Sequence, residues 1–361
     1  MTAATVPVSI HSTSSDPHVW LDDPFALPLV ITPSRDRSVE NLRTFLDSHR
    51  KEVQTWIIRH GAILFRGFDV TKPEHFETIA RGVDNDLKNE YLGTSPRNAL
   101  TPYVFSASEL PPYYPIPQHC EMSFLPNAPS RVFFSCLIEP KSFGGETPLV
   151  DFRRVAQDLS PELRERFAEK GVTVIRNYTG PGDSGKFDLW QLKRWDEMFL
   201  TTDKAQVEQK CRQLDIQCEW LPGNKLRLTN TRPAFQKHPV TGELVWFNHS
   251  QVFHLSAAAA ELRRVGHRTG QVRSRLLSVF ASATVYFKSR MLASNEHSMH
   301  CTFGDGTEIS NKDMDQVRDA IWKNMKIFRW QLGDVVAIDN FSVSHGRMPY
   351  SGPRLVVVAW S

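Results

Sequence analysis

Two histidines and one glutamate form a set of side chains that could hold a metal ion. His119 and Glu121 are two positions apart, and His345 lies near the C-terminal end of the chain. Alternate residues share a face on a strand but diverge on a helix, and Pro115 and Pro117 favour extended backbone just upstream. Two imidazoles and one carboxylate leave further coordination positions open, which is typical of non-haem Fe(II) sites that activate oxygen.

The His-x-acid spacing is weak evidence by itself. In a chain with this many histidines and acids, chance alone gives about one or two such triplets. A second triplet, His75 and Glu77, falls in a predicted helix over Pro73–Val83, where its two side chains point apart. Taken alone, His345 is more typical of a buried core histidine. The metal prediction therefore depends on what surrounds these residues.

An arginine follows the third candidate ligand. The segment around His345 predicts two strands joined by a turn that contains Pro349, and Arg354 opens the second strand. An arginine can hold the far carboxylate of a diacid through a planar bidentate fork, which a lysine cannot reproduce. The sequence thus indicates a metal enzyme with a carboxylate co-substrate. The alternative for Arg354 is an ordinary surface charge at the start of a strand.

Apolar periodicity predicts short strands and several helices, without an alternating βαβ order or a glycine-rich phosphate loop. This pattern predicts a mainly β fold with helical decoration, built on an antiparallel core. The expected strands cover residues 62–68, 131–138, 172–178, 225–231, 243–247, 334–339 and 354–360, and the expected helices cover 38–59, 73–83, 161–170, 203–214, 257–265 and 313–325.

Two segments fall outside this regular pattern. The polar residues 1–20 predict a flexible arm. Residues 91–118 are rich in proline, serine, tyrosine and asparagine, and a loop of that length in a compact domain is typical of a lid or binding loop. The length fits one domain over residues 1–361.

The ordered motifs of the chain resemble the taurine dioxygenase (TauD/TfdA) and clavaminate synthase-like family of Fe(II)- and 2-oxoglutarate-dependent dioxygenases. The resemblance runs from about Gly61 to the C-terminus. The matching segments are Gly61–Phe68, His119–Glu121, Gly144–Asp151, Val245–Asn248 and Trp330–Arg354.

This resemblance implies a fold, three cofactors and a set of site residues. His119, Glu121 and His345 would bind Fe(II), while Thr147 and Arg354 would hold the co-substrate 2-oxoglutarate, and O₂ would be the oxidant. The family fold is a double-stranded β-helix, that is, a cupin-like jelly roll. Its long helical insertion between the core strands would cover about residues 154–328 here.

The resemblance also narrows the range of substrates that we expect. Family members that bind sulfonates carry a second arginine on the last strand, where this chain has Leu355–Trp360, so taurine-like substrates are disfavoured. Glu121 stands where related halogenases have a small residue, so chlorination is disfavoured. By analogy with this branch, we expect oxidation of a small amino-acid-like molecule in specialised metabolism, free or bound to a carrier protein. Arg97 and Asn248 are the candidate substrate-binding residues, with a solvated loop arginine and a turn-closing asparagine as the alternatives.

Composition excludes several other classes of protein. The net charge is +3, with no basic run, which gives no reason to expect a nucleic-acid partner. No apolar stretch is long enough for a membrane span. Five cysteines without Cys-x-x-Cys spacing favour reduced thiols in a cytoplasmic protein. Nothing in the sequence indicates an oligomeric state.

Two other functions remain open from the residues alone. The same His/Glu/His set could hold Zn²⁺ and activate water for hydrolysis. The chain could also be a jelly-roll binding protein without turnover, in which Arg354 would need no metal-bound partner.

Overall fold

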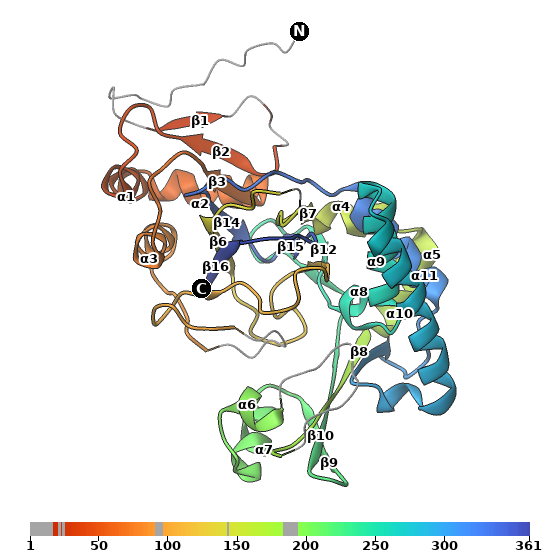
Figure 1. The fold of residues 1–361 in the computed structure, drawn as a ribbon. Coiled ribbons are helices and arrows are strands. Elements are labelled where there is room, and N and C mark those ends of the chain that lie inside the picture. The colour runs from red at the N-terminus through yellow and green to blue at the C-terminus, as the bar shows by residue number, and fades with distance from the viewer. Residues whose placement is uncertain (1–16, 21–22, 24–25, 91–96, 143, 183–193) are drawn as a thin grey trace.

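The computed structural model describes residues 17–20, 23, 26–90, 97–142, 144–182 and 194–361 of the chain. Within these residues, helices surround four separate sheets (Figure 1). The largest sheet has seven strands in the order β1-β2-β3-β14-β6-β16-β4. These strands are β1 (His18–Trp20), β2 (Leu29–Thr32), β3 (Ala62–Phe65), β4 (Phe105–Ser106), β6 (Arg131–Ile138), β14 (Val335–Asp339) and β16 (Leu355–Trp360).

A three-stranded sheet, in the order β5-β15-β7, carries the residues of greatest chemical interest. Its strands are antiparallel, and its central strand brings the C-terminal part of the chain between two earlier segments. The strands are β5 (Ile116–His119), β7 (Leu149–Asp151) and β15 (Val343–Arg347).

The middle of the chain forms a second region of sheet and helices. A four-stranded sheet, in the order β13-β8-β10-β9, extends away from the large sheet with α6 and α7 beside it (Figure 1). The remaining strands are β8 (Val172–Tyr178), β9 (Gln217–Leu221), β10 (Lys225–Arg232), β11 (Phe235–Lys237), β12 (Leu244–Trp246) and β13 (Met299–Phe303).

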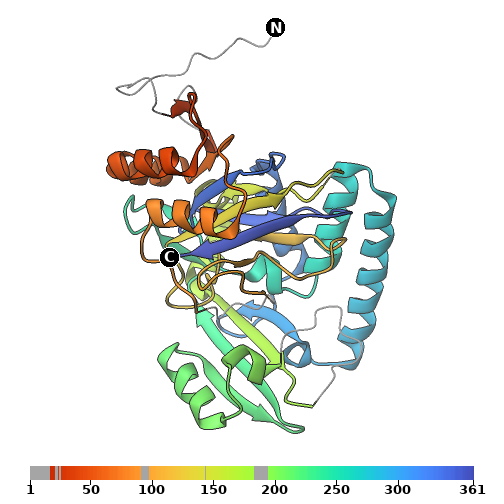
Figure 2. The same cartoon turned by 60° about the vertical axis from the view of Figure 1, so that its left-hand side comes forward.

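Helices cover the outer face of the seven-stranded sheet and the side of the molecule away from it (Figures 1 and 2). The first three pack on the large sheet, and α9 and α10 form a helical pair at the far edge. The helices are α1 (Val39–Ser48), α2 (Arg50–His60), α3 (Pro73–Val83), α4 (Phe152–Asp158), α5 (Pro161–Lys170), α6 (Trp195–Phe199), α7 (Lys204–Gln213), α8 (Ser250–Phe253), α9 (Ala257–Thr269), α10 (Val272–Met291) and α11 (Asn311–Lys323), with a short 3₁₀ turn at Ser294–Glu296.

The strands of the large sheet are apolar on both faces, because each face packs on a different layer. On β16, Val356 and Val358 belong to the inner apolar cluster, which continues to the three-stranded sheet. Val357, between them, belongs to the outer cluster formed with α1, α2 and α3. This alternation follows from the two-residue period of a strand. The inner cluster lies between the two sheets.

Most of the predicted elements are confirmed. The strands over 131–138 and 172–178 and the helix over 73–83 have the predicted bounds. The helix expected over 38–59 is two helices, because His49 leaves helical geometry between them. The 20-residue helix α10 was not predicted, since its large apolar side chains do not face the core.

The predicted segments at the N-terminus and before β5 are described in part. Residues 1–16 of the expected arm lie outside the described residues, while His18–Trp20 form a strand paired with β2. Residues 91–96 of the expected lid also lie outside them, and the rest of that segment contains β4 and β5. The fold therefore consists of mixed sheets and helices, and no sheet is closed into a barrel among the described residues.

One glycine between α2 and β3 packs tightly against β15, the strand that carries His345. Gly61 has φ +77°, and a Cβ atom there would lie 2.2 Å from Cγ2 of Val343. We expect Gly61→Ala to reduce the free energy of unfolding by about 1–3 kcal/mol beyond the effect of a left-handed alanine alone. Gly242→Ala is the matched control, because Gly242 also has positive φ but nothing within 4 Å of its Cβ position. Equal losses in urea unfolding of the two variants would contradict this packing argument.

Candidate metal centre

Three residues from distant parts of the chain meet at the three-stranded sheet. His119 ends β5 and pairs in register with His345 of β15, and Glu121 follows two positions later. One nitrogen of each histidine and one oxygen of Glu121 all lie within 4.8 Å of one another. The Nε2 atom of His345 is 3.5 Å from Oε2 of Glu121. The structure thus brings together the three residues that the sequence singled out as candidate ligands.

The main chain orients the His119 ring. Nδ1 of His119 lies 2.8 Å from the carbonyl oxygen of Pro117. A carbonyl can only accept, so Nδ1 carries the hydrogen and Nε2 keeps its lone pair. This is the usual way in which a protein fixes the tautomer of a metal-binding histidine. In contrast, Nδ1 of His345 is buried without a hydrogen-bond partner among the described residues.

The side chain of Asn340 holds the backbone of Glu121. Its Oδ1 accepts a hydrogen bond of 2.6 Å from the Glu121 N–H, and its Nδ2 donates one of 3.0 Å to the Glu121 carbonyl. The same Nδ2 also donates to the carbonyl of Pro129 at 2.8 Å. Asn340 directly follows β14, so it ties the glutamate to the large sheet. These bonds fix the backbone of Glu121 and therefore the direction in which its side chain points.

The Glu121 carboxylate is buried and paired with an arginine. Its side chain is 3% exposed, and Nη2 of Arg97 donates a hydrogen bond of 2.7 Å to Oε2. Burial acts to raise the pKa of Glu121, but the charge of Arg97 and the hydrogen bond with His345 hold that pKa well below its usual range. Glu121 is therefore ionised at neutral pH.

The histidine beside it is held in the neutral form. Burial, followed by the nearby His345, lowers the pKa of His119 to about 4. A neutral imidazole is the form that binds a metal. At pH 7 the cluster thus presents a carboxylate and a neutral imidazole with an available lone pair.

Thr147 and Arg354 contact neighbouring parts of the chain close to β7. Leu149 of β7 pairs with His345, and Thr147 precedes Leu149 by two residues. The Thr147 hydroxyl accepts a hydrogen bond of 3.2 Å from Nε1 of Trp330. Nε of Arg354 donates one of 2.7 Å to the carbonyl of Gly145, two residues before Thr147.

The guanidinium of Arg354 lies against Tyr350 and near the thiol of Cys136. Its central carbon is 5.2 Å from the ring centroid of Tyr350, and its charge acts on the buried thiol of Cys136 in β6. Burial lowers the pKa of Arg354, while Tyr350 and Cys136 oppose that effect. Phe134, two residues before Cys136, packs with its ring centroid 4.8 Å from that of His345. One face of β6 therefore connects the arginine to the cluster.

The two predicted substrate residues make contacts within the protein. Arg97 forms the ion pair with Glu121 and lies 5.3 Å from the Trp360 ring. Asn248 is buried, and its side chain bonds the carbonyl of Ala234 and the N–H of Ser250. Asn248 thus closes the turn that leads into α8. A role of either residue in substrate binding stays a prediction.

A third histidine lies beside the cluster and was not predicted from the sequence. The ring of His249 is 5.4 Å from that of His119 between centroids, and its Nδ1 lies 2.7 Å from Oγ of Ser123. Burial and the charges of the cluster lower its pKa well below the usual range. His249 has no ligand spacing with the other histidines. His249 directly follows Asn248, the last residue of the Val245–Asn248 segment that resembles the family. Only this position could have indicated a role for His249 from the sequence.

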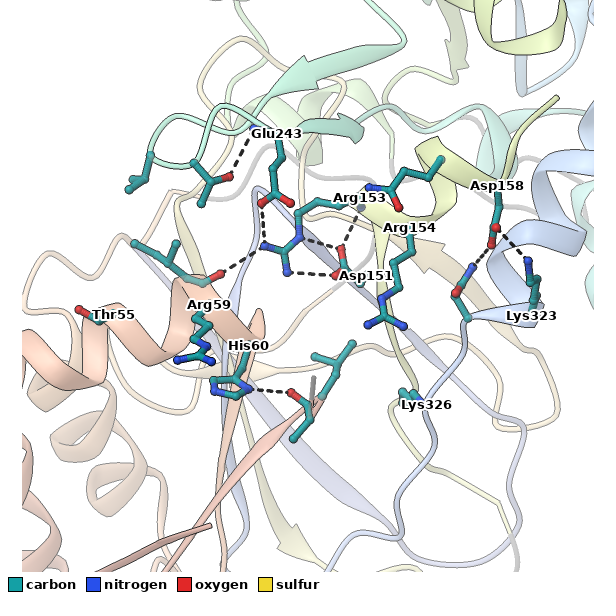
Figure 3. A pocket seen from close by; sticks show the side chains of 17 residues that line it. Thr55, Arg59, His60, Asp151, Arg153, Arg154, Asp158, Glu243, Lys323 and Lys326 are labelled. Atoms are coloured by element: carbon teal, nitrogen blue, oxygen red, sulfur yellow. Dashed lines mark hydrogen bonds and ion pairs between the residues drawn. The ribbon is translucent and has the colours of Figure 1, made fainter. Parts of the chain in front are cut away.

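A large hollow on the described part of the molecule lies away from the candidate metal centre. It measures about 1120 Å³ and is lined by residues at the ends of α2, α4 and α11 and by the turn between β11 and β12 (Figure 3). Arg153 there bonds both Asp151 and Glu243, and Lys323 pairs with Asp158. The three residues of the candidate metal centre do not line this hollow.

Comparison with known proteins agrees with this geometry. The family described as "Taurine catabolism dioxygenase TauD, TfdA family" matches residues 25–360. The chain belongs to this family. Its members are Fe(II)- and 2-oxoglutarate-dependent dioxygenases, so the expectation of an enzyme of this class is confirmed for this TauD-family chain.

Two curated relatives resemble the TauD-family chain over most of its length. It is 30% identical over 334 residues to the dapdiamide synthesis protein DdaC of Enterobacter agglomerans, covering 92% of this chain and 89% of the relative. It is 29% identical over 337 residues to the clavaminate synthase-like protein At3g21360 of Arabidopsis thaliana, with the same coverage.

A solved structure shares the fold. PvcB from Pseudomonas aeruginosa superposes with a TM-score of 0.51 at 11% sequence identity, covering 99% of this chain and 94% of that chain. In the parts of the TauD-family chain that the structure describes, every helix is too short or too polar to cross a membrane.

The contact between Asn340 and Glu121 can be tested directly. We expect Asn340→Ala to weaken Fe(II) affinity roughly 10–100-fold, because the backbone of Glu121 loses both hydrogen bonds to this side chain. The buried carbonyls left without a donor should also reduce the free energy of unfolding by about 1–3 kcal/mol. Anaerobic Fe(II) titration and urea unfolding measure the two effects. Unchanged iron affinity in a folded variant would contradict the positioning role.

Proposed function

We propose that this protein oxidises an unactivated C–H bond of a small amino-acid-like substrate, with release of succinate and CO₂ from 2-oxoglutarate. His119, Glu121 and His345 hold the Fe(II). The observation that carries this proposal is the convergence of these three side chains within 4.8 Å, in a chain that belongs to the TauD/TfdA family.

The residues fit a ferrous ion in their chemistry. Two imidazoles and one carboxylate are the facial set of non-haem Fe(II) oxygenases. Nε2 of His119 keeps its lone pair because Nδ1 is bonded to Pro117, and Glu121 is ionised. A carboxylate has two oxygens, so Glu121 can bind a metal and still accept the hydrogen bond from Arg97.

Thr147 and Arg354 provide the site for 2-oxoglutarate. Arg354 offers a guanidinium whose Nε is fixed by Gly145, which leaves its terminal nitrogens to hold the distal carboxylate. Thr147 presents a hydroxyl that Trp330 orients from behind. With these two residues holding 2-oxoglutarate, its keto-acid end would be the part that binds the iron.

The residues of the chain supply positioning, charge balance and exclusion of water. When bound, Fe(II) with 2-oxoglutarate supplies the oxidising power that a C–H bond requires. Glu121 and the two histidines would hold the ion, and Arg97 balances the buried charge of Glu121. Phe134 covers one side of His345 and keeps water away from the site.

The proposal also covers the architecture of the protein and the class of its substrate. The seven-stranded and three-stranded sheets form the two halves of a double-stranded β-helix, with residues 154–328 as its insertion and 91–118 as the lid. The sequence similarity to a dapdiamide synthesis protein supports a role in specialised metabolism with an amino-acid-like substrate. Hydroxylation, desaturation and ring closure would each follow from how the pocket holds the substrate.

Removal of one ligand tests the proposal. We expect Glu121→Ala to lower Fe(II)-dependent succinate formation by roughly 100-fold or more, because a direct ligand contributes more than the outer contacts that change metal sites 10–100-fold. Glu77→Ala is the matched control, because Glu77 belongs to the other His-x-acid triplet, in α3. Succinate is measured with Fe(II), 2-oxoglutarate, O₂ and a panel of amino acids. Succinate formation that survives Glu121→Ala, or that proceeds with Zn²⁺ in place of Fe(II), would overturn the proposal.

A conservative change at the co-substrate site gives a second test. We expect Arg354→Lys to raise the KM for 2-oxoglutarate roughly 10–100-fold with a smaller effect on kcat, since lysine cannot form the bidentate pair. Lys141→Ala, at an exposed residue near the same turn, should leave both constants unchanged. An unchanged KM in Arg354→Lys would show that another residue holds the distal carboxylate.

A further inference from the structure

Helix α10 turns a row of large apolar side chains toward solvent. Leu276, Phe280 and Phe287 are 66%, 61% and 64% exposed. Together with Ala283 they are spaced at i, i+4, i+7 and i+11, which places them on one face of the helix. The other exposed large apolar residues of α10 are Val272, Val279, Tyr286 and Met291. We call these eight residues the outer face of α10.

The opposite face of α10 explains why this row points outward. Its buried residues are Ser274, Ser278 and Ala281, and this small-residue face packs against α9. Small side chains let the two helices approach closely, so the large side chains are left on the far side. In Figure 2 the pair stands at the edge of the molecule, with α10 outermost.

Two basic residues of α10 make contacts at the edges of the outer face. Arg273 lies 5.1 Å from the ring centroid of Tyr113, and Nε of Arg275 donates to the carbonyl of Gly266. Arg290 lies over the ring of Tyr286 on its own helix, 4.9 Å from the centroid, and so adds one charge near the C-terminal end of the outer face. The helix contains no acidic residue. The eight residues of the outer face itself are all uncharged, which favours a largely apolar partner.

The size of the outer face matches a stable contact between proteins. Its seven large side chains are each more than half exposed. Side chains of this size present on the order of 800 Å² of surface, which equals the share of one partner in a standard interface. Monomeric proteins rarely leave a continuous apolar patch that large in water.

We propose that the outer face of α10 binds the same face of a second copy of this chain, with the two helices antiparallel about a two-fold axis at Ala283. A two-fold contact requires a self-complementary surface. The small Ala283 at the centre lets the helices approach, and in this register Phe280 faces Tyr286 and Val279 faces Phe287 of the other copy. The apolar side chains nearest the axis thereby meet apolar partners, while Leu276 faces Arg290 of the other copy.

Mass measurement and a single charge substitution test the interface. By light scattering at micromolar concentrations, the wild-type protein should have twice the chain mass of 41.2 kDa. Phe280→Glu should weaken the association at least ~100-fold, because two charges would enter an apolar contact. Phe287→Glu is a second variant with the same expectation, checked for folding by circular dichroism. Val240→Glu, at an exposed valine outside α10, should remain a dimer.

A cysteine pair tests the proposed axis. Ala283→Cys should form a disulfide between copies when diamide oxidises the two thiols, while Ser282→Cys, about 100° around the helix, should not. The wild-type protein treated with diamide controls for native cysteines. A monomeric wild-type protein would overturn the proposal. An acidic partner or residues 183–193 would then be left to cover the outer face of α10. A dimer that survives both glutamate variants, or equal crosslinking at 282 and 283, would also overturn the proposal.

Discussion

A carboxylate that is almost completely buried sets the main constraint on this protein. Glu121 is ionised inside the fold, and a buried charge is tolerated only when it is paired and hydrogen-bonded. Arg97 comes from a loop 24 residues earlier, and His345 comes from the C-terminal part of the chain. The fold must therefore bring three separate segments to one point.

The seven-stranded and three-stranded sheets together position these segments. The three-stranded sheet places His119 and His345 side by side through backbone pairing, while Asn340 at the end of β14 holds the main chain of Glu121. The inner face of β6 then links the cluster to Arg354 through Phe134 and Cys136. His119 and His345 thus lie on paired strands, while Glu121, Thr147 and Arg354 lie just beyond the ends of β5, β7 and β16. Rigid elements of this kind keep a reactive site in a fixed geometry.

The sequence could predict the residues whose role depends on their own spacing. The sequence predicted that His119 and Glu121 share a face of a strand favoured by Pro117. The strand ends at His119 and Glu121 lies in the turn after it, so the convergence of the two residues was predicted but not its backbone geometry. The contact of Arg97 with Glu121 was not predictable from the sequence, because only the tertiary structure brings the loop that carries Arg97 to Glu121. Helix α10 was missed for a related reason: its large side chains face outward, so the usual apolar pattern of a core-facing helix is reversed.

The position of a bound metal tests the central claim most directly. Crystals soaked anaerobically with Fe(II), and measured with anomalous scattering at the iron edge, would locate the ion. The account predicts one ion per chain, about 2 Å from a nitrogen of His119, a nitrogen of His345 and an oxygen of Glu121. Iron bound elsewhere, for example beside His300 and Glu308, with nothing between these three side chains, would contradict it.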